Sequence, residues 1–424
     1  MSSHKGAGLF RHGILLMAAT QVANVCNLLF QAFMGWSLEP EEYGVLASML
    51  GLILVVATPM EAMRTSFAHF ASRMAETGHA AGIRRLAARW MVHMLWFSVP
   101  LAVAGVLFRH PLAAFFNLDR TAPIVITSLM LAGCPYPPIL TGALQGMQSF
   151  VWMALSQHSW SVVRLLTGAG LVTLVARRAE WGLIGQTLGV LLSYVFGWAG
   201  LRVVLGAHRK EGDPPHGVGA YFVRSLLVLA GFAVLMNADI VMVKHFFPPR
   251  EAGLFARAGT IGRSLVFLPM PIALAMFPKV TSTGRASRHD WVTLLKSVLF
   301  AGFVVVAAAI AFSLITKLAL LGLFHDRAPT PEMVKLVRCV IWAMSPLGLV
   351  FVLANFEMAQ HRFAAALLLL PCAVAYVVGV TLWHASVFQV AAVLAAVSVA
   401  AMVALAAGLP WRKARDPQPV TSNQ

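Results

Sequence analysis

The sequence has few acidic residues and few charged residues of either sign. Among its 424 residues are 16 Asp and Glu and 32 Lys and Arg, and charged side chains make up 11% of the chain. A soluble globular protein carries about 25% charged residues, so this chain cannot cover a water-facing surface of its length. Hydrophobic residues make up 59% of the chain, which excludes intrinsic disorder. The sequence therefore predicts that lipid is the solvent for most of this protein.

Cysteine is also scarce, and the chain lacks the ligand patterns of a metal site. The 14 histidines show no paired ligand spacing, and we find no catalytic combination of acid, base and nucleophile. The cysteines lie in apolar runs, so we expect small hydrophobic side chains rather than disulfides or zinc ligands. We therefore predict no metal, no cofactor and no enzymatic activity. The cysteines are Cys26, Cys134, Cys339 and Cys372.

Long apolar runs account for most of the chain. A helix needs about 20 apolar residues to cross the hydrocarbon layer of a membrane. The runs are continuously apolar, which disfavours the alternating pattern of a membrane β-barrel. We therefore predict an all-α polytopic membrane protein with about twelve transmembrane helices. The runs lie near His12–Trp36, Tyr43–Phe70, Trp90–Phe108, Ala122–Leu144, Val151–Ala176, Gly182–Leu201, Tyr221–Val243, Ala252–Pro278, Trp291–Ala319, Glu332–Glu357, Phe363–Trp383 and Val387–Pro410.

The basic residues alternate between the loops, which indicates an orientation. A net charge of +16 would favour nucleic-acid binding in a soluble protein, but cytoplasmic loops of membrane proteins also accumulate Lys and Arg. With a cytoplasmic N-terminus, the inner loops and tails hold 16 of these residues and the outer loops hold six. The six are Arg109, Arg120, Arg177, Arg178, Arg250 and Arg327. We predict a multi-pass plasma-membrane protein with both termini in the cytoplasm, with the lipid bilayer and not nucleic acid as its partner.

A short motif recurs at an offset close to half the chain length. Its matches are Pro40 with Pro249, Glu42 with Glu251, Gly44 with Gly253 and, at an offset of 210 rather than 209, Asn27 with Asn237. Chance matching of a loop motif is the alternative to a duplication. Because six spans return the chain to the side where it began, a duplication predicts two parallel six-helix bundles around a central cleft. The bundles would comprise residues 1–210 and 211–424.

The second copy of this motif lies in a region that resembles a known family. The segments Asn237–Phe247, Glu251–Phe255, Phe267–Pro269 and Phe277–Val280 resemble the polysaccharide-biosynthesis, O-antigen-type flippases. These belong to the multidrug/oligosaccharidyl-lipid/polysaccharide exporter (MOP) superfamily. The resemblance implies movement of a polyprenyl-diphosphate-linked oligosaccharide to the outer leaflet of a bacterial inner membrane, in the biosynthesis of surface polysaccharides such as lipopolysaccharide. It also implies polysaccharide polymerase or assembly proteins as partners.

Four arginines inside the predicted spans are the candidate substrate-binding residues. A charge inside lipid is costly and usually faces a bundle interior or a wet cavity. A guanidinium binds a diphosphate with two parallel hydrogen bonds and stays charged when dehydrated. Arg263 and Arg164 lie near the middle of their spans, and Arg257 and Arg338 lie closer to the outer side. The alternative is that these arginines pair with acids or helix-end carbonyls and only fix helix packing.

Three further charged residues are candidates for coupling or gating. Glu61 and Arg64 are three residues apart on one helix face, so they form either a structural ion pair or a gate. Asp239 could be a proton or cation site, a partner for an arginine, or a helix-end contact to Lys244. We expect Lys244 itself to extend its side chain to the lipid headgroups, because it lies near a span end.

The sign of the buried charge favours an anionic cargo. Arginines outnumber acids within the spans, whereas an exporter of organic cations should place carboxylates in its cleft. We therefore expect a flippase that works by alternating access, and a cation-coupled multidrug exporter of the same superfamily remains open. A membrane glycosyltransferase or polymerase is disfavoured by the short loops and few acids, and a non-transporting scaffold is a further alternative. A proton, a sodium ion or the membrane potential could drive the cycle.

Overall fold

The protein folds as helices throughout the part of the chain that the computed structural model describes, which comprises residues 3–76, 81–206, 218–269, 288–359 and 363–408. These residues group into two compact units. One unit comprises Met1–Ala233, Ile240–Arg257 and Lys317–Pro329, and the other comprises Val234–Asp239, Ala258–Thr316 and Thr330–Gln424. The division into lobes at residue 210 stays a prediction.

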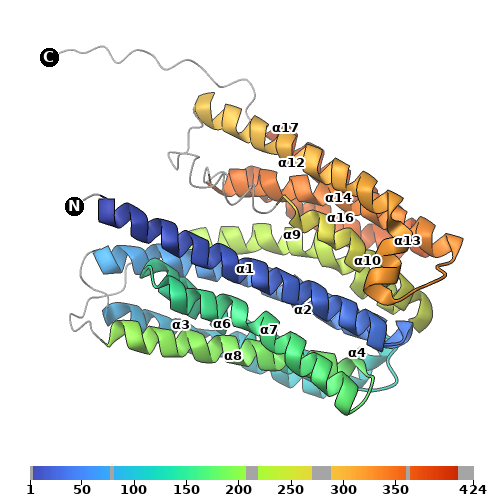
Figure 1. The fold of residues 1–424 in the computed structure, drawn as a ribbon, viewed down its shortest axis with the longest axis horizontal. Helices are drawn as coiled ribbons and strands as arrows, with labels where there is room; N and C mark the ends of the chain where they lie inside the picture. Colours follow the sequence, from blue (N-terminus) through green and yellow to red (C-terminus); the bar gives the residue numbers. More distant parts are fainter. Residues whose placement is uncertain (1–2, 77–80, 207–217, 270–287, 360–362, 409–424) are drawn as a thin grey trace. The chain divides into compact units, whose positions relative to one another are not determined.

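The first unit is built mainly from eight helices that precede residue 206. The long helices α1, α2, α3, α7 and α8 lie lengthwise beside one another (Figure 1). Within this unit α7 packs on both α1 and α8, α2 packs on α6, and α3 packs on α5. The helices are α1 (Ser3–Ser37), α2 (Pro40–Glu76), α3 (Ala81–Leu107), α4 (Arg109–Phe115), α5 (Ala122–Gly133), α6 (Tyr136–Gly146), α7 (Phe150–Leu174) and α8 (Ala179–Leu205).

The remaining helices supply the rest of the first unit and all of the second. In the second unit α14 packs on α12 and α17, and α16 packs on α17. Helices α9, α10 and α13 have residues in both units. The helices are α9 (Val218–Phe246), α10 (Pro249–Phe267), α12 (Arg288–Leu314), α13 (Thr316–Phe324), α14 (Pro331–Ala359), α15 (Phe363–Ala366), α16 (Leu369–Leu382) and α17 (Val387–Gly408).

Each of the twelve predicted runs coincides with a helix or a pair of helices, except where a run extends beyond the described residues. Within those residues, nine helical segments are long and apolar enough to cross a membrane. The other three runs fall on α1, α7 and α10; α7 carries Arg164, and α10 carries Arg257 and Arg263. Exposed leucine, valine, phenylalanine and tryptophan side chains on the helices fit a lipid environment. The chain is thus a polytopic all-α membrane protein.

The fourth predicted span is broken by its prolines. Helix α5 ends at Gly133 and α6 begins at Tyr136, so the backbone turns at Cys134 and Pro135. Pro135, Pro137 and Pro138 supply no amide hydrogens, so three hydrogen bonds of one continuous helix are missing close to this point. Thr141 donates a hydrogen bond of 2.5 Å from its hydroxyl to the Pro137 carbonyl, which lies one turn earlier in α6.

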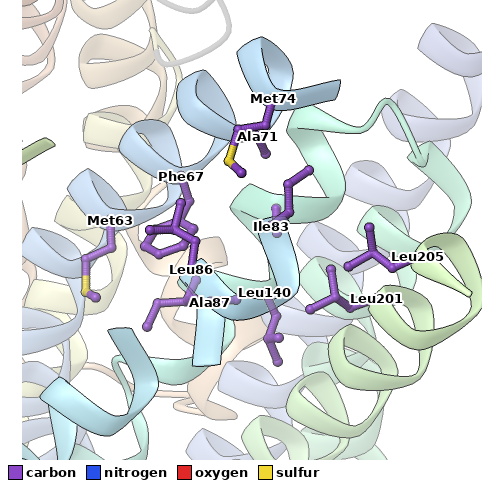
Figure 2. Packing of buried hydrophobic residues seen from close by; sticks show 12 residues of the cluster. Met63, Phe67, Ala71, Met74, Ile83, Leu86, Ala87, Leu140, Leu201 and Leu205 are labelled. Carbon is purple, nitrogen blue, oxygen red and sulfur yellow. The ribbon is translucent and has the colours of Figure 1, made fainter. Parts of the chain in front are cut away.

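A buried apolar cluster holds one end of the first unit together. It contains Met63 and Phe67 from α2, Ile83 from α3 and Leu201 from α8, among others (Figure 2). Partly buried aromatic residues extend the cluster, because the Trp90 ring packs edge-on against Phe67 with a centroid distance of 5.5 Å. The ends of α2, α3 and α8 are therefore fixed relative to one another by packing.

The repeated motif forms the N-terminal turns of α2 and α10. Pro40 and Pro249 are the first residues of these helices, a position where proline is favoured because its amide would have no partner. The two matched glycines meet: a Cβ atom added to Gly44 would lie 2.9 Å from the Cα atom of Gly253. The recurrence in the sequence therefore corresponds to two helix starts that contact each other through glycine.

Candidate functional site

Arg164 is a buried cation whose described contacts are all to neutral groups. It lies in the middle of α7 and is 6% exposed. Its Nη1 atom donates to Gln186 Oε1 of α8 at 2.9 Å, and its Nη2 atom donates to Asn27 Oδ1 of α1 at 2.7 Å. The guanidinium also stacks over the ring of Phe30 at 4.1 Å from the centroid. Amides and an aromatic ring therefore orient the cation, and no described carboxylate contacts it.

Small residues bring α7 and α8 close enough for this contact. A Cβ atom added to Gly185 would lie 2.6 Å from the Cα atom of Gly168, so position 185 must be free of a side chain. Gly168 lies one turn after Arg164, and Gln186 directly follows Gly185. The close approach of the two backbones thus places the Gln186 amide at the guanidinium, in a packing mode typical of helices in lipid.

The electrostatics of this site favour an anion. A buried charge loses its hydration, and a neutral amide oxygen returns only part of that free energy. The Nε atom of Arg164 is buried and has no hydrogen-bond partner among the described residues. An anionic group that reached Arg164 would therefore meet an oriented cation whose charge is not already neutralised.

Arg263 and Asp239 form an ion pair in the second unit. The Nη2 atom of Arg263 lies 2.5 Å from Asp239 Oδ1, and the Arg263 Nε atom donates to the Met236 carbonyl at 3.1 Å. The Asp239 side chain is fully buried, and that of Arg263 is 11% exposed. This pairing matches an alternative that the sequence left open for both residues, an acid as the partner of an arginine. Arg263 thus has an anionic partner, whereas Arg164 contacts no carboxylate among the described residues.

Arg257 and Arg338 contact helix-end carbonyls. The Nη2 atom of Arg257 approaches the Leu38 carbonyl at 3.4 Å, just after the end of α1, and its guanidinium lies 5.4 Å from the Phe324 ring centroid. Arg338 is exposed, and its Nε atom donates to the Ser313 carbonyl near the end of α12 at 2.9 Å. Both contacts fit the packing role that the sequence left open for these arginines.

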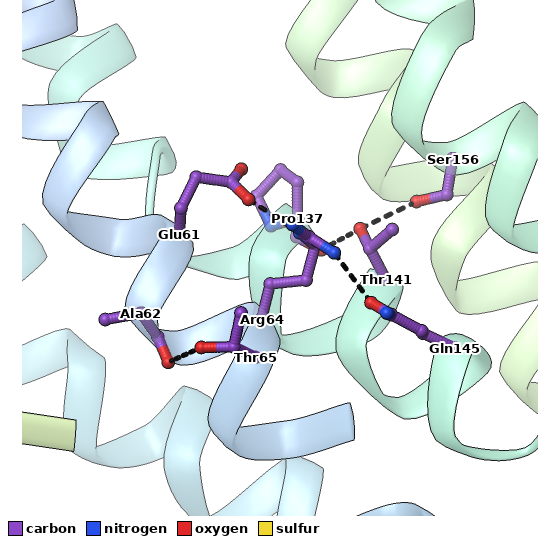
Figure 3. Close-up of polar contacts among 8 residues, drawn as sticks. All are labelled: Glu61, Ala62, Arg64, Thr65, Pro137, Thr141, Gln145 and Ser156. Atoms are coloured by element: carbon purple, nitrogen blue, oxygen red, sulfur yellow. Dashed lines mark hydrogen bonds and ion pairs between the residues drawn. The ribbon is translucent and has the colours of Figure 1, made fainter. Parts of the chain in front are cut away.

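Glu61 and Arg64 form the ion pair that their spacing allows. The Arg64 Nε atom donates to Glu61 Oε2 at 2.6 Å, and its Nη1 atom donates to Gln145 Oε1 of α6 at 2.6 Å (Figure 3). The Glu61 side chain is 48% exposed and that of Arg64 is 19% exposed. The pair therefore links α2 to α6 at a partly exposed position.

Comparison with known proteins identifies the fold. No protein-family model and no curated protein matches the sequence. Among solved structures, an inward-facing multidrug-resistance MATE-family transporter of the MOP superfamily matches with a TM-score of 0.70 and 12% identity, covering 92% of this chain and 93% of that one. The lipid II flippase MurJ, in an inward closed conformation, matches with a TM-score of 0.68 and 13% identity over 93% and 87% of the two chains.

A third structure is a MOP-superfamily transporter from Pyrococcus furiosus, described as having a binding pocket of reverse polarity. It matches with a TM-score of 0.57 and 14% identity, covering 93% of this chain and 92% of that one. All three matches extend over nearly the whole of both chains. The chain therefore has the same fold as these three structures.

The sequence interpretation missed the neutral partners of Arg164. Asn27 and Gln186 hold Arg164, but a search for charged residues inside apolar runs passes over amides. The repeat contained a signal for one of them, because Asn27 matches Asn237. Asn237 is buried, and it lies two residues before Asp239. Asn27 thus contacts Arg164, and Asn237 lies close in sequence to the carboxylate that pairs with Arg263.

A second missed feature is a set of ionic contacts at one end of the first unit. Arg120 pairs with Glu42 at the start of α2 and with Glu180 of α8, the latter at 2.9 Å. Glu42 also accepts a hydrogen bond from the Ala179 amide at 2.7 Å. The sequence showed these residues only as loop charges, because nothing in their spacing reveals that three loops converge.

The expectation that Lys244 extends to the lipid headgroups is wrong. Lys244 is 1% exposed and lines a small cavity with Glu41, Glu42 and Asp119. Acidic side chains from two other segments give the ammonium group a protein environment, so it does not need the membrane surface.

Among the described residues, no group of three His, Cys, Asp or Glu side chains comes together that could hold a metal ion.

Proposed function

We propose that this chain is a flippase that moves a polyprenyl-diphosphate-linked oligosaccharide from the cytoplasmic to the outer leaflet by alternating access. In this proposal the membrane is the bacterial inner membrane and the glycan serves surface polysaccharide biosynthesis. The observation that carries the proposal is Arg164, a buried cation with neutral described partners. The likeness of the fold to the lipid II flippase MurJ supports a lipid-linked cargo.

Arg164 is assigned to the diphosphate because the chemistry matches. A diphosphate is a dense anion with several acceptor oxygens, and a guanidinium can replace two amide contacts with two charge-assisted hydrogen bonds. Asn27 and Gln186 would then act as placeholders that orient Arg164 before the cargo arrives. The resemblance to polysaccharide flippases over Asn237–Phe247 and Glu251–Phe255 supports an oligosaccharide as the attached group.

The test is direct binding of a lipid diphosphate to the full-length purified protein. Native mass spectrometry with added long-chain polyprenyl diphosphate should show an adduct on the wild type. The Arg164→Gln variant should bind about 10-fold to 100-fold more weakly, since a charge-assisted contact contributes roughly 1.5–3 kcal/mol. Arg164→Lys should be intermediate, because it keeps the charge and loses the planar fork.

The matched control is Arg338→Gln, which removes an exposed arginine from the second unit. It should bind the lipid like the wild type. Thermal unfolding of each variant in the same detergent checks that the protein is folded. If the folded wild type and Arg164→Gln bind the lipid equally well, Arg164 is not part of the binding site, and the proposed anionic cargo is contradicted.

The second candidate function is a cation-coupled multidrug exporter. The fold likeness to a multidrug-resistance MATE-family transporter favours it, as does the fully buried carboxylate of Asp239. In that function Asp239 would alternate between Arg263 and a proton or sodium ion. Efflux of a cationic dye that is lost in Asp239→Asn but kept in Arg164→Gln would establish this function instead. The Pyrococcus furiosus transporter, described as having a binding pocket of reverse polarity, supports the view that the charge of the pocket differs between proteins of this fold.

A further inference from the structure

A cavity in the first unit, separate from Arg164, is surrounded by arginines. Its volume is about 550 Å³, and it lies between the N-terminal part of α3 and the C-terminal turn of α8. Arg84 and Arg85 of α3 and Arg202 of α8 line it, together with Trp198. None of the described residues that line it is acidic. No step of the proposed transport function uses these arginines.

Packing holds the arginines at their positions. Ile83, Leu86 and Ala87 of α3 belong to the buried cluster of Figure 2, as do Leu201 and Leu205 of α8. These residues alternate with the arginines along the same helical turns, so the buried side chains fix the backbone from which the charges project. Trp198 also packs against this cluster and forms one wall of the cavity.

The cavity walls favour an anion. The Arg202 guanidinium stacks over the Trp198 ring at 5.0 Å from the centroid, which orients its hydrogen-bond donors. Arg84 and Arg85 lie at the start of α3, where the helix dipole is also positive and disfavours added cations. A phosphate bound in the cavity would accept charge-assisted hydrogen bonds from the guanidinium groups that line it.

The position of the cavity indicates a membrane lipid. The candidate spans Gly82–Leu107 and Ala179–Leu205 respectively begin and end at the cavity, so it lies at headgroup depth. On α3, exposed apolar side chains continue from Ala88 at helical spacing, and on α8 they continue from Trp198 in the same way. They are Val92, Trp96, Val99 and Val103 on α3, and Val195, Leu191 and Leu188 on α8.

We propose that this cavity binds the phosphate headgroup of an anionic phospholipid, with the acyl chains lying along the exposed apolar faces of α3 and α8. The arginines of the cavity bind the headgroup. The apolar faces bind the acyl chains, so the site selects a lipid over a soluble phosphate. The site belongs to the first unit and is independent of the cargo site at Arg164.

The test uses full-length protein in detergent with added phosphatidylglycerol, and phosphatidylcholine as the zwitterionic comparison. Native mass spectrometry should show phosphatidylglycerol adducts on the wild type and weaker phosphatidylcholine adducts. The triple variant Arg84→Gln, Arg85→Gln, Arg202→Gln should bind phosphatidylglycerol about 100-fold more weakly, since each basic residue contributes about fivefold near an anionic lipid. Arg202→Lys alone should weaken binding less than Arg202→Gln.

The matched control removes the same number of charges from the other loops. The triple variant Arg177→Gln, Arg178→Gln, Arg327→Gln changes exposed arginines and should bind like the wild type. Equal phosphatidylglycerol binding by wild type and by the folded cavity variant would overturn the proposal. Displacement of the lipid by equimolar inorganic pyrophosphate would also overturn it, because the site would then recognise a soluble phosphate.

Discussion

At the scale of single residues, Arg164 and Arg263 differ in how their charge is compensated. Arg263 has a carboxylate 2.5 Å away, whereas Arg164 has amide oxygens at 2.7 Å and 2.9 Å. The sequence predicts that both are buried, because each interrupts an apolar run. It does not predict the difference, since Asp239 and Asn27 reach their arginines from other helices. Compensation is a tertiary property that spacing along one helix cannot reveal.

The Arg263–Asp239 pair should be strongly coupled in stability. Asp239→Asn leaves the Arg263 guanidinium in a buried position without a counter-ion, which should cost about 3–5 kcal/mol. The free energy of unfolding, measured by titration with SDS in mixed micelles, checks this. The control is the double variant Asp239→Asn, Arg263→Met, which removes both charges and should recover most of the loss. If the single and double variants are equally unstable, the pair is not the source of the effect.

The same double variant separates a structural pair from a coupling site. If Asp239 only neutralises Arg263, transport by the double variant should return together with its stability. If Asp239 takes up a driving ion, transport should stay absent although the protein is stable. Both outcomes are read from the same preparation reconstituted into vesicles.

Glu61→Gln should have a small effect compared with Asp239→Asn. Glu61 is about half exposed, and a partly exposed ion pair contributes roughly 0–1 kcal/mol. Arg64 keeps its hydrogen bond to Gln145 in this variant, so the link between α2 and α6 persists. SDS titration of Glu61→Gln should therefore show less than about 1 kcal/mol of destabilisation. A loss as large as that of Asp239→Asn would contradict this and indicate a buried pair with a gating role.

At the scale of helices, the sequence predicts well which segments are helical, and it predicts less well where a helix is interrupted. Runs of about 20 apolar residues leave the backbone no alternative to helix in lipid, so every predicted run coincides with helical structure over its described residues. The break between α5 and α6 coincides with three closely spaced prolines, whereas the single prolines inside α2, α3 and α14 do not interrupt those helices. The short helices α4 and α13 lie at or next to span ends, where hydropathy no longer separates helix from loop. The depth of Lys244 was also unpredictable, because it depends on acids contributed by α2 and by the loop before α5.

The contact between the starts of α2 and α10 should be intolerant of a methyl group. A Cβ atom on Gly253 would meet the backbone carbonyl of Pro40, which cannot move aside as a flexible side chain could. Gly253→Ala should therefore destabilise the protein by about 1–3 kcal/mol and separate the helix ends. A cysteine placed at Val45, which is buried, should then react faster with a thiol reagent.

The comparison for this variant is Gly170→Ala in α7. An added Cβ atom there meets nothing within 4 Å, so stability and the reactivity of the cysteine at position 45 should not change. If Gly253→Ala matches Gly170→Ala in both measurements, the glycine contact does not hold α2 and α10 together.

At the scale of the whole molecule, contacts at one end of the first unit support the predicted alternation of loops. Arg120 lies before α5 and pairs with Glu42 at the start of α2 and with Glu180 at the start of α8. Asn117 donates to the Lys244 and His245 carbonyls at the end of α9. The first, third, fifth and seventh loops therefore meet at one end, as they must if each preceding run crosses the membrane once. The fold does not tell which side of the membrane this end faces, so the distribution of the charged residues must decide it.

The charge distribution predicts which loops face outward, and two matched serines can test this prediction. Ser386 precedes α17 in a predicted outer loop, Ser149 precedes α7 in a predicted inner loop, and both side chains are partly exposed. Serine to cysteine is nearly isosteric, and the four native cysteines are buried or only partly exposed, so the unmodified chain gives the background labelling. In intact cells a membrane-impermeant maleimide should label Ser386→Cys, and it should label Ser149→Cys only after permeabilisation. If only Ser149→Cys is labelled in intact cells, the topology is the inverse of the predicted one, and the loops rich in Lys and Arg do not lie in the cytoplasm. The arginine cavity between α3 and α8 would then face the outer leaflet, so the same experiment decides which leaflet supplies its lipid.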